Sequence, residues 1–386
     1  MKTWDVIVIG GGVIGLSLAI ELRKGGASVL VVERGEPGRE ASHAAGGMLV
    51  DSPLETAPAL QELAMASARM YPEFAHELEV ESGMKVDLRD YGTILFPHIE
   101  QDGITELRAA AVSLADLAEI EPALGTPSNQ EELEMKVSIY LKEAGIDSNP
   151  DTFAEVSTAY LGTAFCLKER SVDPRALTAA ALKTAKHRGV DFSSGDPVTA
   201  VNITDSHVTG VTTTKTSFLS AKVVNCAGAW SSQVGPHAIP TRPVKGQMLC
   251  LAMPSRTLLK HVIRSPKAYL IPRSDGRLLV GATVEEAGFD KRTVPETIQR
   301  LHKAAIELVP QLAGARILED WAGLRPGTPD ALPILGATSV PGYFVATGHF
   351  RDGILLAPVT ARVMAAMIEG RKPDYDLSAF SPARFA

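Results

Sequence analysis

The chain has 386 residues, of which 45% are hydrophobic, and this is enough apolar material for two or three domain cores. A formal net charge of −7 without long basic runs argues against a nucleic-acid-binding surface, so we expect small-molecule partners. The cysteines Cys166, Cys226 and Cys250 lie far apart without a CxxC pair. Their spacing argues against disulfides and against a metal site, and it favours a cytoplasmic protein.

The first predicted unit is a strand, a glycine turn, a helix and a second strand that ends at Glu33. Gly10 permits a tight turn, Gly12 lets a pyrophosphate approach the backbone, and Gly15 lets helix and strand pack closely. The helix N-terminus offers N–H groups to phosphates, and Glu33 is placed to accept hydrogen bonds from a ribose. Four glycines interrupt the apolar run at 6–22, which is too short to span a membrane. The unit predicts a dinucleotide site, with an ordinary glycine turn as the alternative.

The next segments lead out of this unit. Residues 34–48 are rich in small side chains and predict close backbone contact with a flat ligand, the alternative being a flexible surface loop. Apolar spacing predicts a helix over 58–83, and we expect a strand at 90–96 and a helix at 104–117. The last two elements would open a second domain.

The second half of the chain alternates strands and helices again. A loop is expected at 145–149, and Asp173 followed by Pro174 predicts a helix start. Strands are expected at 190–201, 208–214 and 221–226, which would return the chain to the first sheet. Residues 242–320 combine strand candidates with a helix at 296–308, and the chain ends with a glycine turn at 348–353 and a helix to about Glu369.

Seven motifs in order resemble one known family. They are GGGVIG with Glu33, AAGGM at 44–48, VNCAGAW at 224–230, YLIPR at 269–273, GAT at 281–283, WAGLRP at 321–326 and GHFRDGIL at 348–355. They cover nearly the whole chain, and the last two are the most specific. The chain resembles the FAD-dependent D-amino acid oxidase superfamily, and within it the bacterial glycine oxidases of thiamine biosynthesis.

The resemblance implies an α/β fold with a discontinuous, Rossmann-like FAD-binding domain and an α+β substrate domain that carries a mixed or antiparallel sheet. The expected boundaries are 1–85, 145–232 and 320–386 for the FAD-binding domain, and 86–144 and 233–319 for the substrate domain. It also implies a homotetramer.

The expected cofactor is noncovalent FAD. Three distant glycine turns suit a buried flavin better than an exchangeable NAD. A helix N-terminus after Gly353 would stabilise the charge on the reduced ring; for this turn alone, an ordinary strand-to-helix connection is the alternative. The expected contacts are Gly10, Gly12, Val13, Ile14, Gly15, Glu33, Arg34, Ala41, Ser42, Gly46, Gly47, Met48, Val198, His349, Phe350, Arg351, Asp352, Gly353, Ile354 and Leu355.

The expected reaction needs positioning more than acid or base chemistry. A guanidinium grips a carboxylate with two parallel hydrogen bonds, and the resemblance assigns that role to Arg325, with Tyr269 and Arg351 nearby. Without the family pattern, an arginine followed by proline would be interpreted as a surface residue that forms an ion pair. We expect His349 to be hydrogen-bonded to backbone rather than to act as a base.

Covalent attachment of flavin in related proteins uses a late cysteine or an early histidine. This chain has no cysteine after Cys250, so only His43 offers a route. Two departures from the glycine oxidase pattern concern the substrate: Val284 replaces a methionine and Lys267 replaces a histidine. Both would admit a longer or acidic substrate.

The sequence therefore predicts oxidative deamination of glycine, sarcosine, a small D-amino acid or an N-substituted glycine. Hydride would pass to flavin N5, and O2 would reoxidise the flavin to give H2O2. The alternatives are a dehydrogenase that passes electrons to a quinone or carrier, and a non-catalytic flavin-binding scaffold or sensor. No nucleic acid, membrane or metal is expected as a partner.

Overall fold

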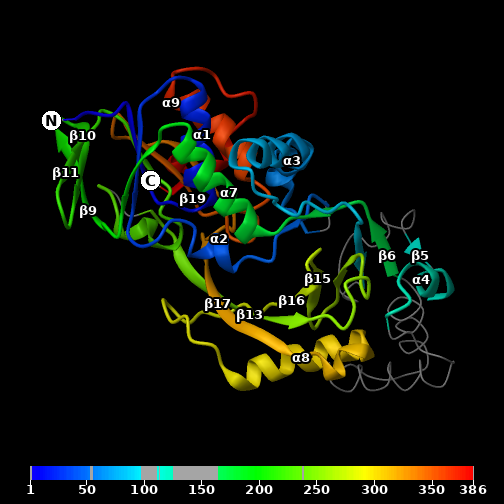
Figure 1. Ribbon diagram of the computed structural model, residues 1–386. Helices are drawn as coiled ribbons and strands as arrows, with labels where there is room; N and C mark the ends of the chain where they lie inside the picture. The colour runs from blue at the N-terminus through cyan, green and yellow to red at the C-terminus, as the bar shows by residue number, and fades with distance from the viewer. Residues whose placement is uncertain are drawn as a thin grey trace.

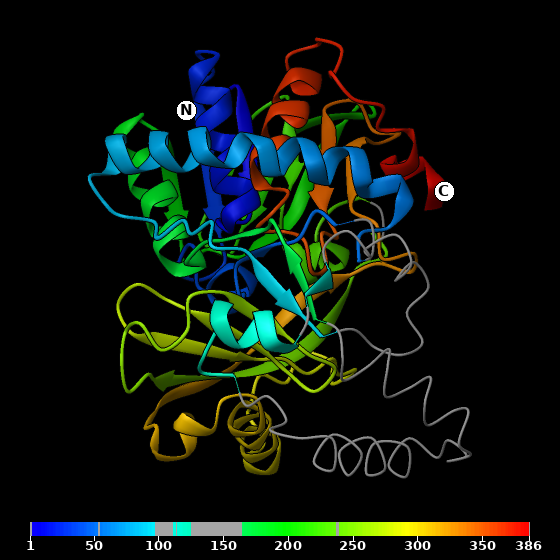
Figure 2. The same cartoon turned by 90° about the vertical axis from the view of Figure 1, so that its right-hand side faces the viewer.

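The computed structural model describes residues 2–52, 55–96, 111–112, 114–124, 164–236 and 239–385. Two large sheets organise these residues (Figure 1). A six-stranded sheet covered by long helices forms one half, and an eight-stranded sheet with helix α8 (Pro295–Leu308) on its outer side forms the other (Figure 2). The expected α/β fold with a mixed sheet in its second half is confirmed.

The six-stranded sheet is built around the first strand of the chain. Its order is β18-β19-β12-β1-β2-β8, and all neighbours are parallel except β18 and β19. The strands are β1 (Val6–Ile9), β2 (Val29–Glu33), β8 (Asp191–Ser194), β12 (Val223–Asn225), β18 (Ile334–Ala337) and β19 (Tyr343–Thr347). The predicted return of the chain to its first sheet is confirmed for β8 and β12, which join β1 and β2. It is wrong for the strand expected at 208–214 and for the end of the one expected at 190–201, because these residues pair with each other in a separate three-stranded sheet.

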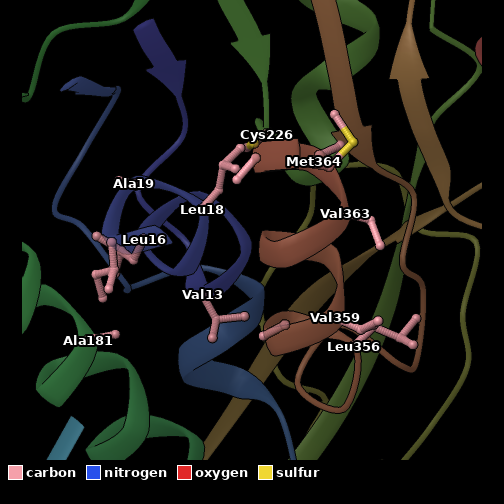
Figure 3. Packing of buried hydrophobic residues seen from close by; sticks show 14 of the residues in the cluster. Val13, Leu16, Leu18, Ala19, Ala181, Cys226, Leu356, Val359, Val363 and Met364 are labelled. Atoms are coloured by element: carbon pink, nitrogen blue, oxygen red, sulfur yellow. The ribbon is translucent and has the colours of Figure 1, made fainter. Parts of the chain in front are cut away.

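The two faces of this sheet pack against different layers. Val6 and Val8 of β1 belong to the core beneath the helices, whereas Ile7 and Ile9 belong to the core on the opposite face, as strand alternation requires. The helices are α1 (Val13–Lys24), α3 (Gln61–Ser82), α7 (Pro174–His187) and α9 (Ala357–Ile368). Figure 3 shows side chains of α1 and α9 meeting in this core. A meander of β9 (Val198–Thr204), β10 (His207–Thr213) and β11 (Ser217–Leu219) lies on the opposite side.

Most predicted helices are found where local signals placed them. Asp173 caps α7, and its carboxylate accepts hydrogen bonds from the backbone N–H of Arg175 at 2.9 Å and of Ala176 at 3.2 Å. The helix expected at 58–83 is a 3-10 turn (Pro58–Leu60) followed by α3. Further 3-10 turns are η3 (Gly228–Gln233), η4 (Pro310–Gly314), η5 (Ser378–Phe380) and η6 (Pro382–Phe385).

The helix expected at 104–117 is partly wrong. Residues 104–110 and the loop at 145–149 lie outside the described residues, but Ala111–Val112 is strand β5, and helix α4 is Leu114–Ile120. β5 pairs with β6 (Ala164–Leu167), more than 50 residues later. Local apolar spacing carries no information about such a distant partner.

The eight-stranded sheet presents alternate side chains to α8 and to the other half of the protein. Its order is β17-β13-β16-β15-β14-β4-β6-β5, with β14 and β4 parallel and the other pairs antiparallel. Leu270 of β15 packs in the α8 core, whereas Tyr269 and Ile271 face inward. The remaining strands are β4 (Thr93–Leu95), β13 (Arg242–Ala252), β14 (Val262–Arg264), β15 (Tyr269–Pro272), β16 (Arg277–Gly281) and β17 (Ile317–Gly327).

Between the halves run helix α2 (Ala41–Ala44) and a two-stranded pair of β3 (Met48–Leu49) and β7 (Arg170–Ser171). Among the described helices, none has the length and apolar character needed to cross a membrane.

Candidate active site

A cavity of about 610 Å³ lies between the two halves. It is lined by residues at the carboxyl ends of β1, β2, β12 and β19, and by the inward face of β13, β15 and β17. Open parallel sheets bind ligands outside the carboxyl ends of their strands. The fold therefore places this cavity where a dinucleotide is expected, with a second sheet forming its far wall.

The glycine turn after β1 is tightly packed. Gly10 has φ +106°, and a Cβ atom there would lie 2.4 Å from the carbonyl oxygen of Cys226. A Cβ at Gly15 would lie 2.0 Å from the carbonyl oxygen of Gly10. Gly12 faces the cavity, with Ser42 3.3 Å from where its Cβ would be. These short distances show that no side chain fits at Gly10 or Gly15, where β1, α1 and β12 meet.

Two side chains fix the start of α1 and retain hydrogen-bonding capacity. The buried Glu33 carboxylate accepts hydrogen bonds from the N–H of Gly11 at 2.7 Å and of Gly35 at 2.9 Å. Ser42 accepts one from the N–H of Val13 at 2.9 Å. A carboxylate has about four lone-pair sites, so Glu33 can still accept from a ribose. The Ser42 hydroxyl retains a proton to donate at the helix N-terminus, where anions bind.

Aromatic and charged side chains form the wall next to Glu33. The Arg34 guanidinium lies 4.1 Å from the ring centroid of Trp230, and that ring lies 5.3 Å from the ring of Phe289. Lys291 pairs with Glu40 at 2.9 Å. Phe289 and Lys291 of the loop after β16 therefore contact two of the residues that line the cavity here, Trp230 and Glu40.

The turn before α9 forms another wall. The backbone carbonyl oxygen of Asp352 accepts a hydrogen bond from the N–H of Leu356 at 2.8 Å, which closes a turn after Gly353, and α9 begins at Ala357. His349 is buried, and its Nε2 lies 3.1 Å from the Thr360 hydroxyl. Burial lowers the pKa of His349 to about 3. This histidine is neutral at physiological pH, and its Nε2 contacts a side chain of α9 rather than the expected backbone group.

Arg325 and Tyr269 meet at the far wall. Arg325 Nη1 donates to the carbonyl oxygen of Thr283 at 3.0 Å and lies 3.4 Å from that of Lys245. Its guanidinium covers Gly246, where a Cβ atom would lie 2.3 Å from Nη1. The Tyr269 hydroxyl lies 3.7 Å from the Met248 sulfur.

Burial raises the pKa of Tyr269, while Arg325 and Arg351 act to lower it. Both Arg325 and Tyr269 line the cavity, so a fixed cation and a neutral hydroxyl face the same space.

A buried ionic group beside this wall was not found from the sequence. Arg264 of β14 bonds both carboxylate oxygens of Glu169, at 2.9 and 3.0 Å, and also pairs with Glu55. Burial raises the pKa of Glu169, although Arg264 opposes this. Arg264 and Glu55 line the cavity. Because the three residues come from distant segments, no local motif points to them.

The cavity brings together most of the residues expected from the sequence. The catalytic set (Arg325, Tyr269 and Arg351) lines it, as do all the expected cofactor residues except Gly15 and Leu355. Gly15 packs behind the glycine turn, and the carbonyl oxygen of Leu355 accepts a hydrogen bond from Ser67 at 2.6 Å.

Of the two departures from the glycine oxidase pattern, only one faces the cavity. Val284 lines it and is 65% exposed. Lys267 is not part of the lining and pairs instead with Glu307 of α8 at 3.3 Å. The expectation that Lys267 widens the substrate range is therefore wrong, because its ammonium lies on the α8 side of the sheet.

The chain belongs to the family of FAD dependent oxidoreductases known as DAO, whose pattern matches residues 5–367. Its cofactor is therefore FAD. The glycine turn, the acceptor oxygens of Glu33 and the cavity at the strand ends fit this group.

Among its relatives, the chain is 32% identical to a glycine oxidase from Pseudomonas aeruginosa, covering 98% of each chain. It is 35% identical to a bifunctional protein ThiO/ThiG from Synechocystis sp. over 99% of this chain, and it spans only 54% of that relative. The crystal structure of glycine oxidase from Geobacillus kaustophilus matches with a TM-score of 0.85 and 29% identity, covering 100% of this chain and 99% of that one.

We predict that acid precipitation releases the flavin from the purified protein. His43 is absent from the cavity lining, and the only cysteine in that lining is Cys226, whose thiol pKa is raised by burial. His43 therefore does not reach a flavin in the cavity, and the Cys226 thiol stays protonated and is a poor nucleophile. Yellow colour that stayed with the precipitate would contradict this prediction and identify a covalent bond.

The raised pKa of Asp352 predicts that the free energy of unfolding of the FAD-free protein depends on pH. Burial raises its pKa from 3.8 to about 6, with Glu55 acting in the same direction and Arg351 against it. Because the pKa of Asp352 is raised on folding, its contribution to stability is fully present below pH 3.8 and is lost as pH rises through about 6. Asp352→Asn removes this loss. We expect the variant to gain on the order of 2 kcal/mol over the parent above the folded pKa and little below the unfolded one.

Urea unfolding at several pH values measures this difference. His349 has a lowered pKa and the opposite pH slope, but it is present in both proteins and cancels in the comparison. A constant gap between variant and parent across the pH range would contradict a titrating Asp352.

Proposed function

We propose that this protein oxidises glycine or a related small amine that carries a carboxylate, using FAD and O2 and producing H2O2. The observation that carries the proposal is Arg325, whose guanidinium is held by the Thr283 carbonyl and faces the same cavity as the glycine turn. The glycine oxidase relatives support the substrate class.

The residues of the chain act mainly by positioning. Arg325 binds the substrate carboxylate through N–H groups that its two carbonyl contacts leave available, and Tyr269 adds a hydroxyl. When bound, FAD supplies the acceptor for the hydride that leaves the substrate α-carbon. His349 serves no proton transfer in this scheme, since it is buried against Thr360. Holding two reactants in the correct geometry can by itself give a large gain in rate.

The substrate end of the cavity is lined by uncharged side chains as well as by Tyr269 and Arg325. Val284, Ala282 and Met248 line the cavity near Tyr269 and are uncharged. We therefore propose that sarcosine, small D-amino acids and N-substituted glycines are accepted in addition to glycine. A place in thiamine biosynthesis and a homotetrameric assembly, both implied by the resemblance, remain proposals.

The division into two domains also remains a proposal. The six-stranded and eight-stranded sheets support two units. β6 and β17 come from segments expected in the FAD-binding domain, yet both pair within the eight-stranded sheet because their hydrogen-bonding partners are β4 and β13.

A panel of amines tests the proposed function. Purified protein is mixed with glycine, sarcosine, small D-amino acids and N-substituted glycines, and both peroxide and the visible flavin absorbance are followed. We expect peroxide from glycine or sarcosine and from at least one larger amine. Flavin reduction without peroxide would establish the dehydrogenase alternative instead. Absence of flavin reduction by every amine would leave the scaffold or sensor reading.

A further inference from the structure

Arg273 is an arginine buried without full hydrogen bonding. It follows β15 directly, has 0% exposed surface, and its Nη2 donates to the carbonyl oxygen of Gly46. In the described part of the chain, its Nε and Nη1 have no hydrogen-bond partner. Asp173 and Asp87 favour its charge, whereas Arg277 and Arg89 oppose it. An arginine is rarely buried so completely unless it is paired.

The segment that Arg273 contacts lies between it and the cavity. Gly46, Gly47 and Met48 all line the cavity, whereas Arg273 does not. Further backbone contacts hold the same segment. The Gly47 carbonyl oxygen accepts a hydrogen bond from the N–H of Val172 at 2.8 Å, and β3, which begins at Met48, pairs with β7. Gly47 has φ +79°, and a Cβ there would lie 2.0 Å from the Val172 oxygen.

The orientation of one peptide group follows from these contacts. In a planar trans peptide, the C=O of one residue and the N–H of the next point in opposite directions. Because the Gly46 carbonyl is turned to Arg273, the N–H of Gly47 points away from Arg273. We propose that Arg273 is a positioning residue that turns the Gly46–Gly47 peptide so that its N–H faces the FAD ring. This inference rests on the proposed function, since it takes the cavity to hold FAD.

Arg277 provides a matched control. It belongs to β16 of the same sheet, pairs with Asp173 at 2.5 Å and with Asp275 at 2.7 Å, and has no described hydrogen bond to Gly46. Replacing either arginine removes a guanidinium near Asp173. Only replacement of Arg273 releases the Gly46 peptide.

The experiment compares Arg273→Met, Arg273→Lys and Arg277→Met with the parent. FAD is removed, and the Kd for added FAD is measured by quenching of flavin fluorescence, together with the visible spectrum of the bound flavin. We expect Arg273→Met to raise Kd on the order of tenfold or more, the usual effect of losing a hydrogen bond from a charged donor. Arg273→Lys is expected to recover part of this loss, and Arg277→Met to stay within about threefold.

Urea unfolding of the FAD-free variants separates positioning from general stability. A raised Kd and an altered flavin spectrum for Arg273→Met, with Arg277→Met unchanged in both, support the inference. An equal rise in Kd for both variants, or parental Kd and spectrum for Arg273→Met, overturns it. If Arg273→Met does not fold, Arg273→Lys decides: a raised Kd supports the inference, and a parental Kd contradicts it. Failure of the parent itself to bind FAD would refute the proposed function rather than this inference.

Discussion

Arg325→Ala is expected to retain bound FAD with an unchanged spectrum and to lose kcat/KM on the order of 30-fold or more. Removing one partner of a buried charge pair typically costs roughly 2 to 5 kcal/mol, and each ~1.4 kcal/mol corresponds to tenfold. The carbonyl oxygens of Thr283 and Lys245 accept hydrogen bonds from Arg325, so the protein itself orients the guanidinium. Steady-state kinetics with the best amine of the panel measure the loss.

Three further variants show how the loss in kcat/KM depends on each side chain at this wall. Arg325→Lys keeps the charge without the two-pronged geometry and should recover only part of the activity. Tyr269→Phe removes one neutral hydrogen bond and should lose roughly 0.5 to 1.5 kcal/mol. Arg351, which is exposed at the cavity, is the alternative clamp. Kinetics of Arg325→Ala within a few-fold of the parent, together with lost binding in Arg351→Ala, would show that the substrate lies elsewhere in the cavity.

Gly15→Ala is expected to abolish or greatly weaken FAD binding. The added methyl group would lie 2.0 Å from the Gly10 carbonyl oxygen and 3.2 Å from a Val8 methyl carbon. A backbone oxygen cannot swing away as a flexible side chain can, so the glycine turn must shift. Overpacking of this kind typically costs roughly 1 to 3 kcal/mol in stability. FAD content after purification and urea unfolding of the FAD-free protein measure the two effects.

Gly314→Ala is the control for this substitution. Gly314 has ordinary φ, and no heavy atom lies within 4 Å of where its Cβ would be. Its variant should bind FAD like the parent and be equally or slightly more stable. A Gly15→Ala protein with parental FAD affinity would mean that the turn tolerates a side chain, against the geometry of the structure.

The sequence predicts the parts of the fold that depend on neighbouring residues. The unit from β1 to β2 follows from its glycines and its alternating apolar strands, and α7 follows from Asp173 before Pro174. The short strand β5 does not follow, since its partner β6 lies far along the chain.

The candidate site shows the same limit. Arg325 and Tyr269 were found through motifs that resemble a known family. The pairing of Arg264 with Glu55 and Glu169, and the contact of Arg273 with Gly46, depend on which strands become neighbours. The side of the sheet on which Lys267 lies was also set by tertiary packing rather than by its distance from Tyr269 in the sequence.

We propose that FAD in this cavity takes electrons from an amine whose carboxylate is bound by Arg325. Anaerobic titration tests it most directly: yellow parent protein and Arg325→Ala are each mixed with increasing glycine or sarcosine, and the visible flavin absorbance is recorded. We expect the parent to bleach at substrate concentrations where Arg325→Ala, with the same FAD content, stays yellow. Admitting O2 should then restore the colour of the parent and yield peroxide. Equal bleaching of the two proteins at every concentration would contradict it.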